Sequence, residues 1–243
     1  MFRFQRQGGM LGSVTLTLLI LVVAGPAFGG IITYGPTLHD NGGAGYGAGT
    51  VGTYTDPQFD DLGGLLTLTK VTLTVTIDGD GGAHAWDNEG GTATTITLGI
   101  GSEVRVKGPV PPGSQLVVNP DAFTTVTGPI TADTDGAPDF IGTDSLSIIG
   151  TSVTDTRSSF KTGVSDLVPY IGVGLATFSF DGGTSTSGTS ALPGPAANLV
   201  TFGTTNFRFT TTLQYEYIPE PSSIALAALG GMGSLAIAIR RRR

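Results

Sequence analysis

A regular alternation of apolar and polar side chains constrains the fold of this chain more than any other feature. Between residues 206 and 218, a bulky or β-branched residue occupies every second position, and mostly polar or charged residues fill the positions between them. The inner series is Phe207, Phe209, Thr211, Leu213, Tyr215 and Tyr217. Because successive side chains of a β-strand point to opposite faces, the pattern predicts a long strand with one buried face.

Shorter runs with the same period occur earlier in the chain. The two clearest are Val71-Leu73-Val75-Ile77 and Ile96-Leu98-Ile100, and weaker ones lie near 115–118, 144–149 and 174–180. Leu66 and Leu68 are out of phase with Val71, which predicts a β-bulge near Thr69–Lys70. Turn-forming residues separate the runs, and no part of 30–218 keeps a helical period. We therefore expect residues 30–218 to form an all-β domain, an antiparallel β-sandwich of jelly-roll-like type.

The first 29 residues have the organisation of a secretory signal peptide. Arg3 and Arg6 precede an apolar stretch at 11–24, and Ala27-Phe28-Gly29 supplies the small residues that a signal peptidase needs. We expect cleavage after Gly29 or within a residue or two of it. The alternative is an N-terminal anchor that is retained.

The last 25 residues, 219–243, have three parts in a fixed order. Pro219-Glu220-Pro221 is followed by an uncharged apolar segment at 224–239. Four basic residues end the chain: Arg240, Arg241, Arg242 and Arg243. As a helix, the apolar segment would be about 24 Å long, shorter than the roughly 30 Å of a bilayer's hydrocarbon core. It predicts a single, short transmembrane helix whose arginine end stays in the cytoplasm.

This arrangement resembles the PEP-CTERM sorting signal of Gram-negative bacteria. The resemblance implies that Pro219, Glu220 and Pro221 are recognised by an exosortase, a membrane protease. It also implies that the protein passes through the inner membrane, is cut near the motif and then reaches the cell surface or the medium.

Charge excludes some partners for the segment that remains. The two ends hold six of the 12 basic residues and one of the 19 acidic residues, so 30–218 has a net charge of about −12. Such a surface repels nucleic acid and anionic lipid, and it suits cations or a neutral polysaccharide. The absence of cysteine excludes disulfides and thiolate chemistry.

Two internal segments resemble the choice-of-anchor E domain. One is 59–73, with a Phe-Asp, a Leu-Gly and a Leu-Thr pair ahead of an alternating strand, and the other is Tyr170-Ile171-Gly172-Val173-Gly174. The closing strand from Phe209 to Tyr217 fits the same family. The resemblance implies a bacterial surface domain and assigns no activity.

Catalytic patterns are weak in this sequence. The chain has two histidines, both in glycine-rich surroundings, and no Gly-x-Ser-x-Gly sequence. We therefore expect a protein that is not an enzyme and needs no cofactor.

Two features suggest binding instead. Asp133, Asp135 and Asp139 surround a glycine in a spacing that suits a calcium ion, although aspartate and glycine are also ordinary turn residues. Trp86, the only tryptophan, is expected in a loop, where it would either stack on a sugar or fold back on the sheet edge. The sequence thus predicts a non-catalytic surface or matrix protein of an exopolysaccharide-producing cell. The alternative is a carbohydrate- or calcium-binding module.

Overall fold

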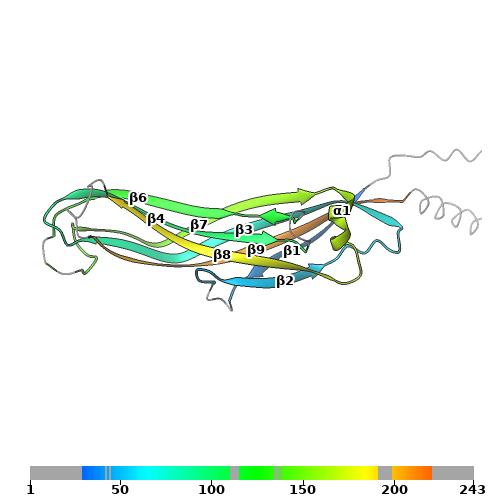
Figure 1. The fold of residues 1–243 in the computed structure, drawn as a ribbon, viewed down its shortest axis with the longest axis horizontal. Coiled ribbons are helices and arrows are strands. Elements are labelled where there is room, and N and C mark those ends of the chain that lie inside the picture. Colours follow the sequence, from blue (N-terminus) through cyan, green and yellow to red (C-terminus); the bar gives the residue numbers. More distant parts are fainter. Residues whose placement is uncertain are drawn as a thin grey trace, which may run out of the picture.

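The computed structural model describes residues 29–41, 43, 45–109, 115–133, 136, 138–190 and 199–220. In this part of the chain, nine β-strands form two antiparallel sheets (Figure 1). The first sheet has the order β1 (Gly30–His39), β9 (Leu199–Pro219), β3 (Leu66–Asn88) and β7 (Ser145–Lys161). The second has the order β2 (Val51–Pro57), β8 (Leu175–Ser190) and β4 (Thr94–Lys107), with β5 (Val117–Val118) and β6 (Asp121–Ile130) both paired to the far side of β4.

The strand pairs are nested. β1 pairs with β9, β2 with β8, β3 with β7 and β4 with β6, so the chain folds back on itself as one long double ribbon. This nested order is that of a jelly roll. Several strands are long, and the body is elongated along them (Figure 1). The expectation of an antiparallel all-β fold is confirmed.

The strand predicted from the alternating series is the C-terminal half of β9. Its inner residues Phe207, Phe209, Leu213 and Tyr215 are fully buried. The predicted bulge is also present, because the register between β3 and β9 shifts between Leu68 and Lys70.

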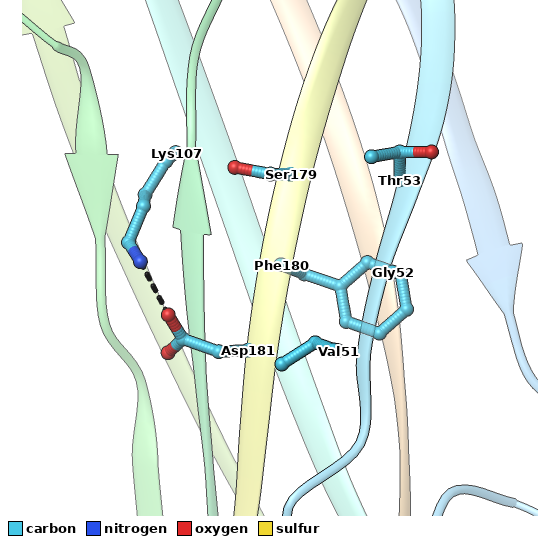
Figure 2. Close-up of a pocket in the computed structure, with 7 residues that line it drawn as sticks. All are labelled: Val51, Gly52, Thr53, Lys107, Ser179, Phe180 and Asp181. Atoms are coloured by element: carbon cyan, nitrogen blue, oxygen red, sulfur yellow. Dashed lines mark hydrogen bonds and ion pairs between the residues drawn. The ribbon is translucent and has the colours of Figure 1, made fainter.

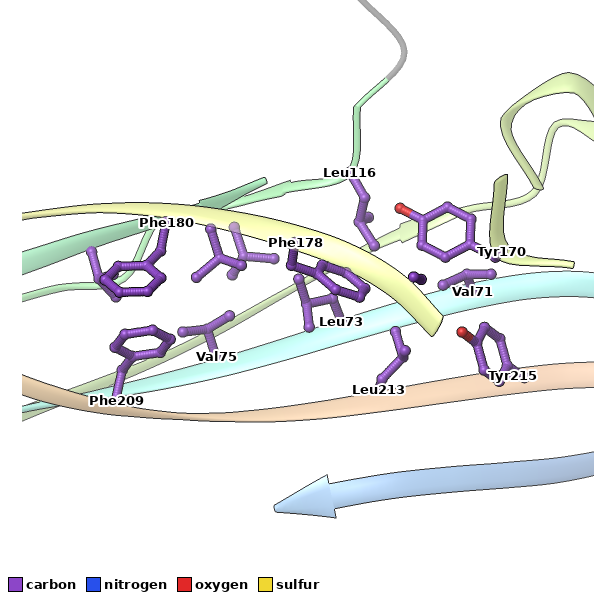
Figure 3. Close-up of a cluster of buried hydrophobic side chains, with 14 of the residues drawn as sticks. Val71, Leu73, Val75, Leu116, Tyr170, Phe178, Phe180, Phe209, Leu213 and Tyr215 are labelled. Carbon is purple, nitrogen blue, oxygen red and sulfur yellow. The ribbon is translucent and has the colours of Figure 1, made fainter. Parts of the chain in front are cut away.

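The main core lies between the two sheets (Figure 3). β3 contributes Val71, Leu73 and Val75, and β8 opposes them with Phe178 and Phe180. Burial of each large side chain contributes roughly 1.5–3 kcal/mol. A second apolar cluster consists of Ile96, Leu98, Ile100, Ile130 and Ile148.

The structure adds one feature that the sequence did not predict, a helical turn between β7 and β8. It comprises α1 (Val164–Leu167) and η1 (Val168–Tyr170), and it buries Leu167 and Tyr170 against the core.

Residues 1–28 of the predicted signal peptide and the predicted membrane helix at 224–239 lie outside the described residues. Of the helical residues that are described, none belongs to a helix long and apolar enough to cross a membrane.

Candidate functional site

The end of β9 is where the folded body meets the expected sorting signal. Ile218 pairs with Thr67 of β3, and Pro219 pairs with Leu66. The first proline of the motif is therefore the last residue of a paired strand. Pro221 and the four terminal arginines lie outside the described residues.

Glu220 extends this ladder by one residue. Its backbone N–H donates to the carbonyl oxygen of Leu65 at 2.9 Å. The Thr67 hydroxyl donates to Glu220 Oε1. The backbone of the motif's central residue is thus held by the residue just before β3, and its carboxylate is held by β3 itself. The first two residues of the motif are therefore attached to the folded body, because Pro219 ends the inner strand β9 and Glu220 follows it directly. The contact of Glu220 with Leu65 and Thr67 joins residues far apart in sequence, so no local sequence pattern predicts it.

A tight turn at residues 61–66 positions the Leu65 carbonyl oxygen, which accepts the hydrogen bond from Glu220. The carbonyl oxygen of Asp61 accepts from the N–H groups of Gly64, Leu65 and Leu66 at 3.0 to 3.2 Å. Asp61 Oδ1 also accepts from the N–H of Gly63 at 3.0 Å. Leu62, Gly63 and Gly64 all have positive φ values, which suits the two glycines. The turn places the Leu65 carbonyl where Glu220 reaches it.

A groove of about 240 Å³ lies beside Glu220. Leu66 and Asp61 line it on one side, and Val164, Val168 and Ile171 line it on the other. The sorting glutamate and the α1–η1 turn therefore face the same hollow.

The segments that resemble the choice-of-anchor E domain meet next to this groove. The Phe59 N–H donates to the Tyr170 carbonyl at 2.7 Å, and the Phe59 carbonyl accepts from Gly172 at 2.9 Å. The buried Phe59 ring also packs against Tyr215 and Tyr217, with centroid separations of 5.8 and 5.5 Å. Three segments distant in sequence thus form one contact unit.

Trp86 lies within β3, so the expected loop position is wrong. The glycines on either side of it suggested a loop, yet the strand continues through them and ends at Asn88. The indole packs against the second apolar cluster and meets the buried His84 edge-on at 6.4 Å. Its Nε1 is buried and has no hydrogen-bond partner among the described residues. Sugar contact by Trp86 stays a prediction.

Two of the predicted calcium ligands accept hydrogen bonds from backbone N–H groups of their own loop. Asp133 Oδ1 accepts from the Gly136 N–H at 2.7 Å, and Asp139 Oδ1 accepts from the Ile141 N–H at 2.8 Å. Asp135 lies outside the described residues. Within the described part of the chain, no three His, Cys, Asp or Glu side chains are grouped to hold a metal. Calcium binding here stays a prediction.

A second hollow of about 360 Å³ lies along β2, β8 and β4 (Figure 2). The Lys107 ammonium and the Asp181 carboxylate form an ion pair at one side of it, the Ser179 hydroxyl points toward this pair, and Thr53 also lines the hollow. These residues come from three strands, so their proximity depends on the sheet order. The arrangement offers hydrogen-bonding groups to a polar ligand.

Two titratable side chains with shifted pKa values lie on β1 and β2, the buried Asp56 and the half-buried His39. Asp56 on β2 is only 6 % exposed, and burial raises the pKa of its carboxyl. Burial lowers the pKa of His39, whose Nε2 lies 2.8 Å from Thr211 Oγ1. Each group is therefore shifted toward its neutral form.

Comparison with known proteins identifies the C-terminal segment. Residues 218–243 match the family model described as the PEP-CTERM protein-sorting motif. The motif indicates an exported protein that an exosortase processes. No curated protein and no solved structure matches the chain.

Proposed function

We propose that this chain is a non-catalytic surface or extracellular-matrix protein that an exosortase releases from the inner membrane. The observation that carries the proposal is the direct junction between the two parts of the molecule. The matched motif begins at Ile218, inside the last paired residues of β9. No linker separates the folded sandwich from its sorting signal.

The proposed route follows from the order of the segments. A signal peptidase removes residues 1–29, the segment 224–239 halts in the membrane, and Arg240–Arg243 hold its end in the cytoplasm. The exosortase then cuts near Pro219-Glu220-Pro221. The sandwich reaches the cell surface or the exopolysaccharide outside it.

We also propose that the sandwich is a choice-of-anchor E domain. The contact of Phe59 with Tyr170 and Gly172 supports this, because it brings together the segments on which the resemblance rests. The packing of Phe59 on Tyr215 and Tyr217 adds the closing strand to the same unit.

The proposal is tested by substitution of the sorting glutamate. We expect Glu220→Ala to leave the protein uncleaved in the inner-membrane fraction, because the exosortase loses the charged centre of its signal. Glu216→Ala is the matched control, since it removes a carboxylate from the same strand that is engaged with Lys70 at 2.7 Å. The size and location of the protein on immunoblots of fractionated cells measure the outcome. Normal release of the Glu220→Ala variant would exclude exosortase processing.

A second candidate function is glycan binding by the same sandwich. The hollow of Figure 2 favours it, because the ion pair and the Ser179 hydroxyl beside it match the groups that bind sugar hydroxyls. Binding to a glycan array, measured with and without a chelator, would detect it and show whether calcium takes part. A loss of binding in Asp181→Ala would assign it to this hollow.

A further inference from the structure

We propose that one end of the sandwich contacts the zwitterionic headgroup region of the inner membrane while the chain is still anchored. We call this end the apolar tip and define it by Leu62, Leu65, Val164 and Val168. The inference rests on the proposed function, because it requires the segment 224–239 to enter the bilayer.

The four side chains of the apolar tip are exposed. Val164 is 84 % exposed and Val168 is 60 % exposed, while Leu62 and Leu65 are 56 % and 44 % exposed. Val164 and Val168 line one groove, and Leu62 and Leu65 belong to the 61–66 turn, whose Asp61, Gly64 and Leu66 line the same groove. Exposed apolar side chains gathered around a groove mark a surface that meets another apolar or interfacial phase.

The α1–η1 turn explains why these valines point outward. Leu167 and Tyr170 fill the end of the main core and are 3 % and 0 % exposed. Val164 and Val168 are four residues apart and share a helical face. Burial of the first pair leaves the second pair on the outside, next to the place where the chain leaves the body.

The apolar tip lies next to the residues that lead from the folded body to the segment 224–239, so we expect it to face the membrane. Glu220 lines the same groove as Val164 and Val168. Four residue steps separate Glu220 from Ile224, which limits their separation to roughly 14 Å. As a helix, the segment 224–239 would be about 24 Å long, shorter than the roughly 30 Å hydrocarbon core, so its outer end would be drawn inward. The apolar tip is thereby held at the membrane interface.

The acidic side chains near the apolar tip determine which kind of lipid headgroup it can contact. The carboxylates of Asp61 and Glu220 line the groove, and Asp166 lies on α1 with Lys161 at 3.7 Å. Anionic headgroups would be repelled by this acidic surround, whereas zwitterionic headgroups would not. The contact is therefore a shallow one with neutral lipid.

The absence of cysteine makes the test direct, because any introduced cysteine is unique. The full chain would carry an environment-sensitive dye at Val164→Cys, or at Ile149→Cys as a control. Ile149 lies on β7 and is 74 % exposed, and it pairs with Ala83 far from the tip. Each protein would be reconstituted into phosphatidylethanolamine–phosphatidylcholine vesicles that contain a headgroup spin label. We expect the dye at Val164→Cys to lose most of its emission and the control dye to keep it.

Flotation of the same samples separates the two proposals. If the chain floats with the vesicles but the tip dye is not quenched, the membrane contact is overturned and the anchoring stands. If the chain does not float, the anchored intermediate is overturned, and the tip contact with it. A blue-shifted tip dye that the lipid label cannot quench would show that a second copy of the chain covers the tip, which also overturns the proposal.

A second variant tests the apolar contribution itself. Val168→Ser in the Val164→Cys background keeps the buried residues of the turn and removes one exposed apolar neighbour. We expect it to lower the quenching at the tip, while Leu38→Ser, at another exposed position, leaves it unchanged. Equal quenching in both would show that the short segment between Glu220 and Ile224 alone brings the dye to the lipid, and it would overturn the contact.

Discussion

At the scale of single residues, Glu220 has a structural role in addition to its expected role in recognition. Its N–H donates to the carbonyl oxygen of Leu65, just before β3, and its carboxylate accepts from Thr67 of β3. An enzyme that binds this carboxylate must first separate it from Thr67. We therefore expect Thr67 of β3 to compete with the exosortase for this carboxylate.

Thr67→Val separates the two roles of Glu220. It removes the hydroxyl that donates to Glu220 Oε1 and leaves the sorting motif intact. We expect this variant to be processed at least as fast as the wild type, because the competing contact is weakened. Pulse-chase labelling would measure conversion of precursor to mature protein. Thr74→Val is the matched control. Thr74 lies on β3, as Thr67 does, and the substitution removes its hydroxyl contact with Ser158 of β7. Slower processing of Thr67→Val than of the control would show that docking assists cleavage.

Asp56 predicts a pH dependence of stability. Burial raises the pKa of its carboxyl in the folded state above the ordinary value of 3.8. Below that value both states are protonated, so the group carries no penalty. As the pH rises through the folded pKa, the unfolded state binds fewer protons and the wild type loses stability. We expect Asp56→Asn to gain stability relative to the wild type between pH 3.5 and pH 7.

Urea unfolding at both pH values measures the Asp56 effect. Burial lowers the pKa of His39, so His39 acts in the opposite sense and destabilises the folded state as the pH falls below about 6.5. Because His39 is present in both proteins, the difference between variant and wild type isolates Asp56. A difference that is constant across the range would contradict the prediction.

At the scale of elements, close approach between the sheets depends on a glycine in β8. A Cβ at Gly182 would lie 1.9 Å from Cζ of Phe207, which is fully buried on β9. We expect Gly182→Ala to destabilise the fold by about 1–3 kcal/mol, because the aromatic ring must move within a packed core. Urea unfolding would measure this. In the control Gly183→Ala, the nearest atom belongs to the flexible Glu103 side chain at 3.2 Å. Equal stabilities of the two variants would show that Phe207 moves freely.

Alternation along a strand is the part of the fold that the sequence reveals best. The inner face of β9 and the bulge after Leu68 both follow from which residues are large and apolar. The predicted loop position of Trp86 is wrong because glycines usually interrupt strands, whereas β3 continues through them. β3 pairs with β9 both before and after a register shift between Asp80 and Ala83. The α1–η1 turn is too short to show a helical period.

The candidate site was predictable only in part, for a different reason. The sorting motif is a local pattern, so its residues were found. Its attachment to Thr67 and Leu65 depends on the pairing of β9 with β3, which local sequence does not encode. The ion pair in the hollow of Figure 2 likewise joins two strands whose adjacency is a property of the whole sheet.

At the scale of the whole molecule, β9 is an inner strand with neighbours on both sides. It lies between β1 and β3, and its buried side chains reach across the main core. We expect a chain that ends at Asn206 to be insoluble or unfolded, because it lacks the half of β9 that pairs with both β1 and β3 and carries four fully buried side chains. A chain that ends at Glu220 should fold. Thermal melts followed by circular dichroism would compare them, and a cooperative melt of the shorter chain would show β9 to be dispensable.

The pairing of β1 with β9 also has a consequence in time. In the route proposed above, β1 would emerge first and remain unpaired until β9 follows. The two strands could pair only after residues 199–219 had crossed, when the segment 224–239 would be at the export pore. Pairing of β1 with β9 and arrest of that segment in the membrane would then follow one another. A chain stalled earlier would lack this pairing, so we expect the exosortase to meet the motif only on chains whose sheet is complete.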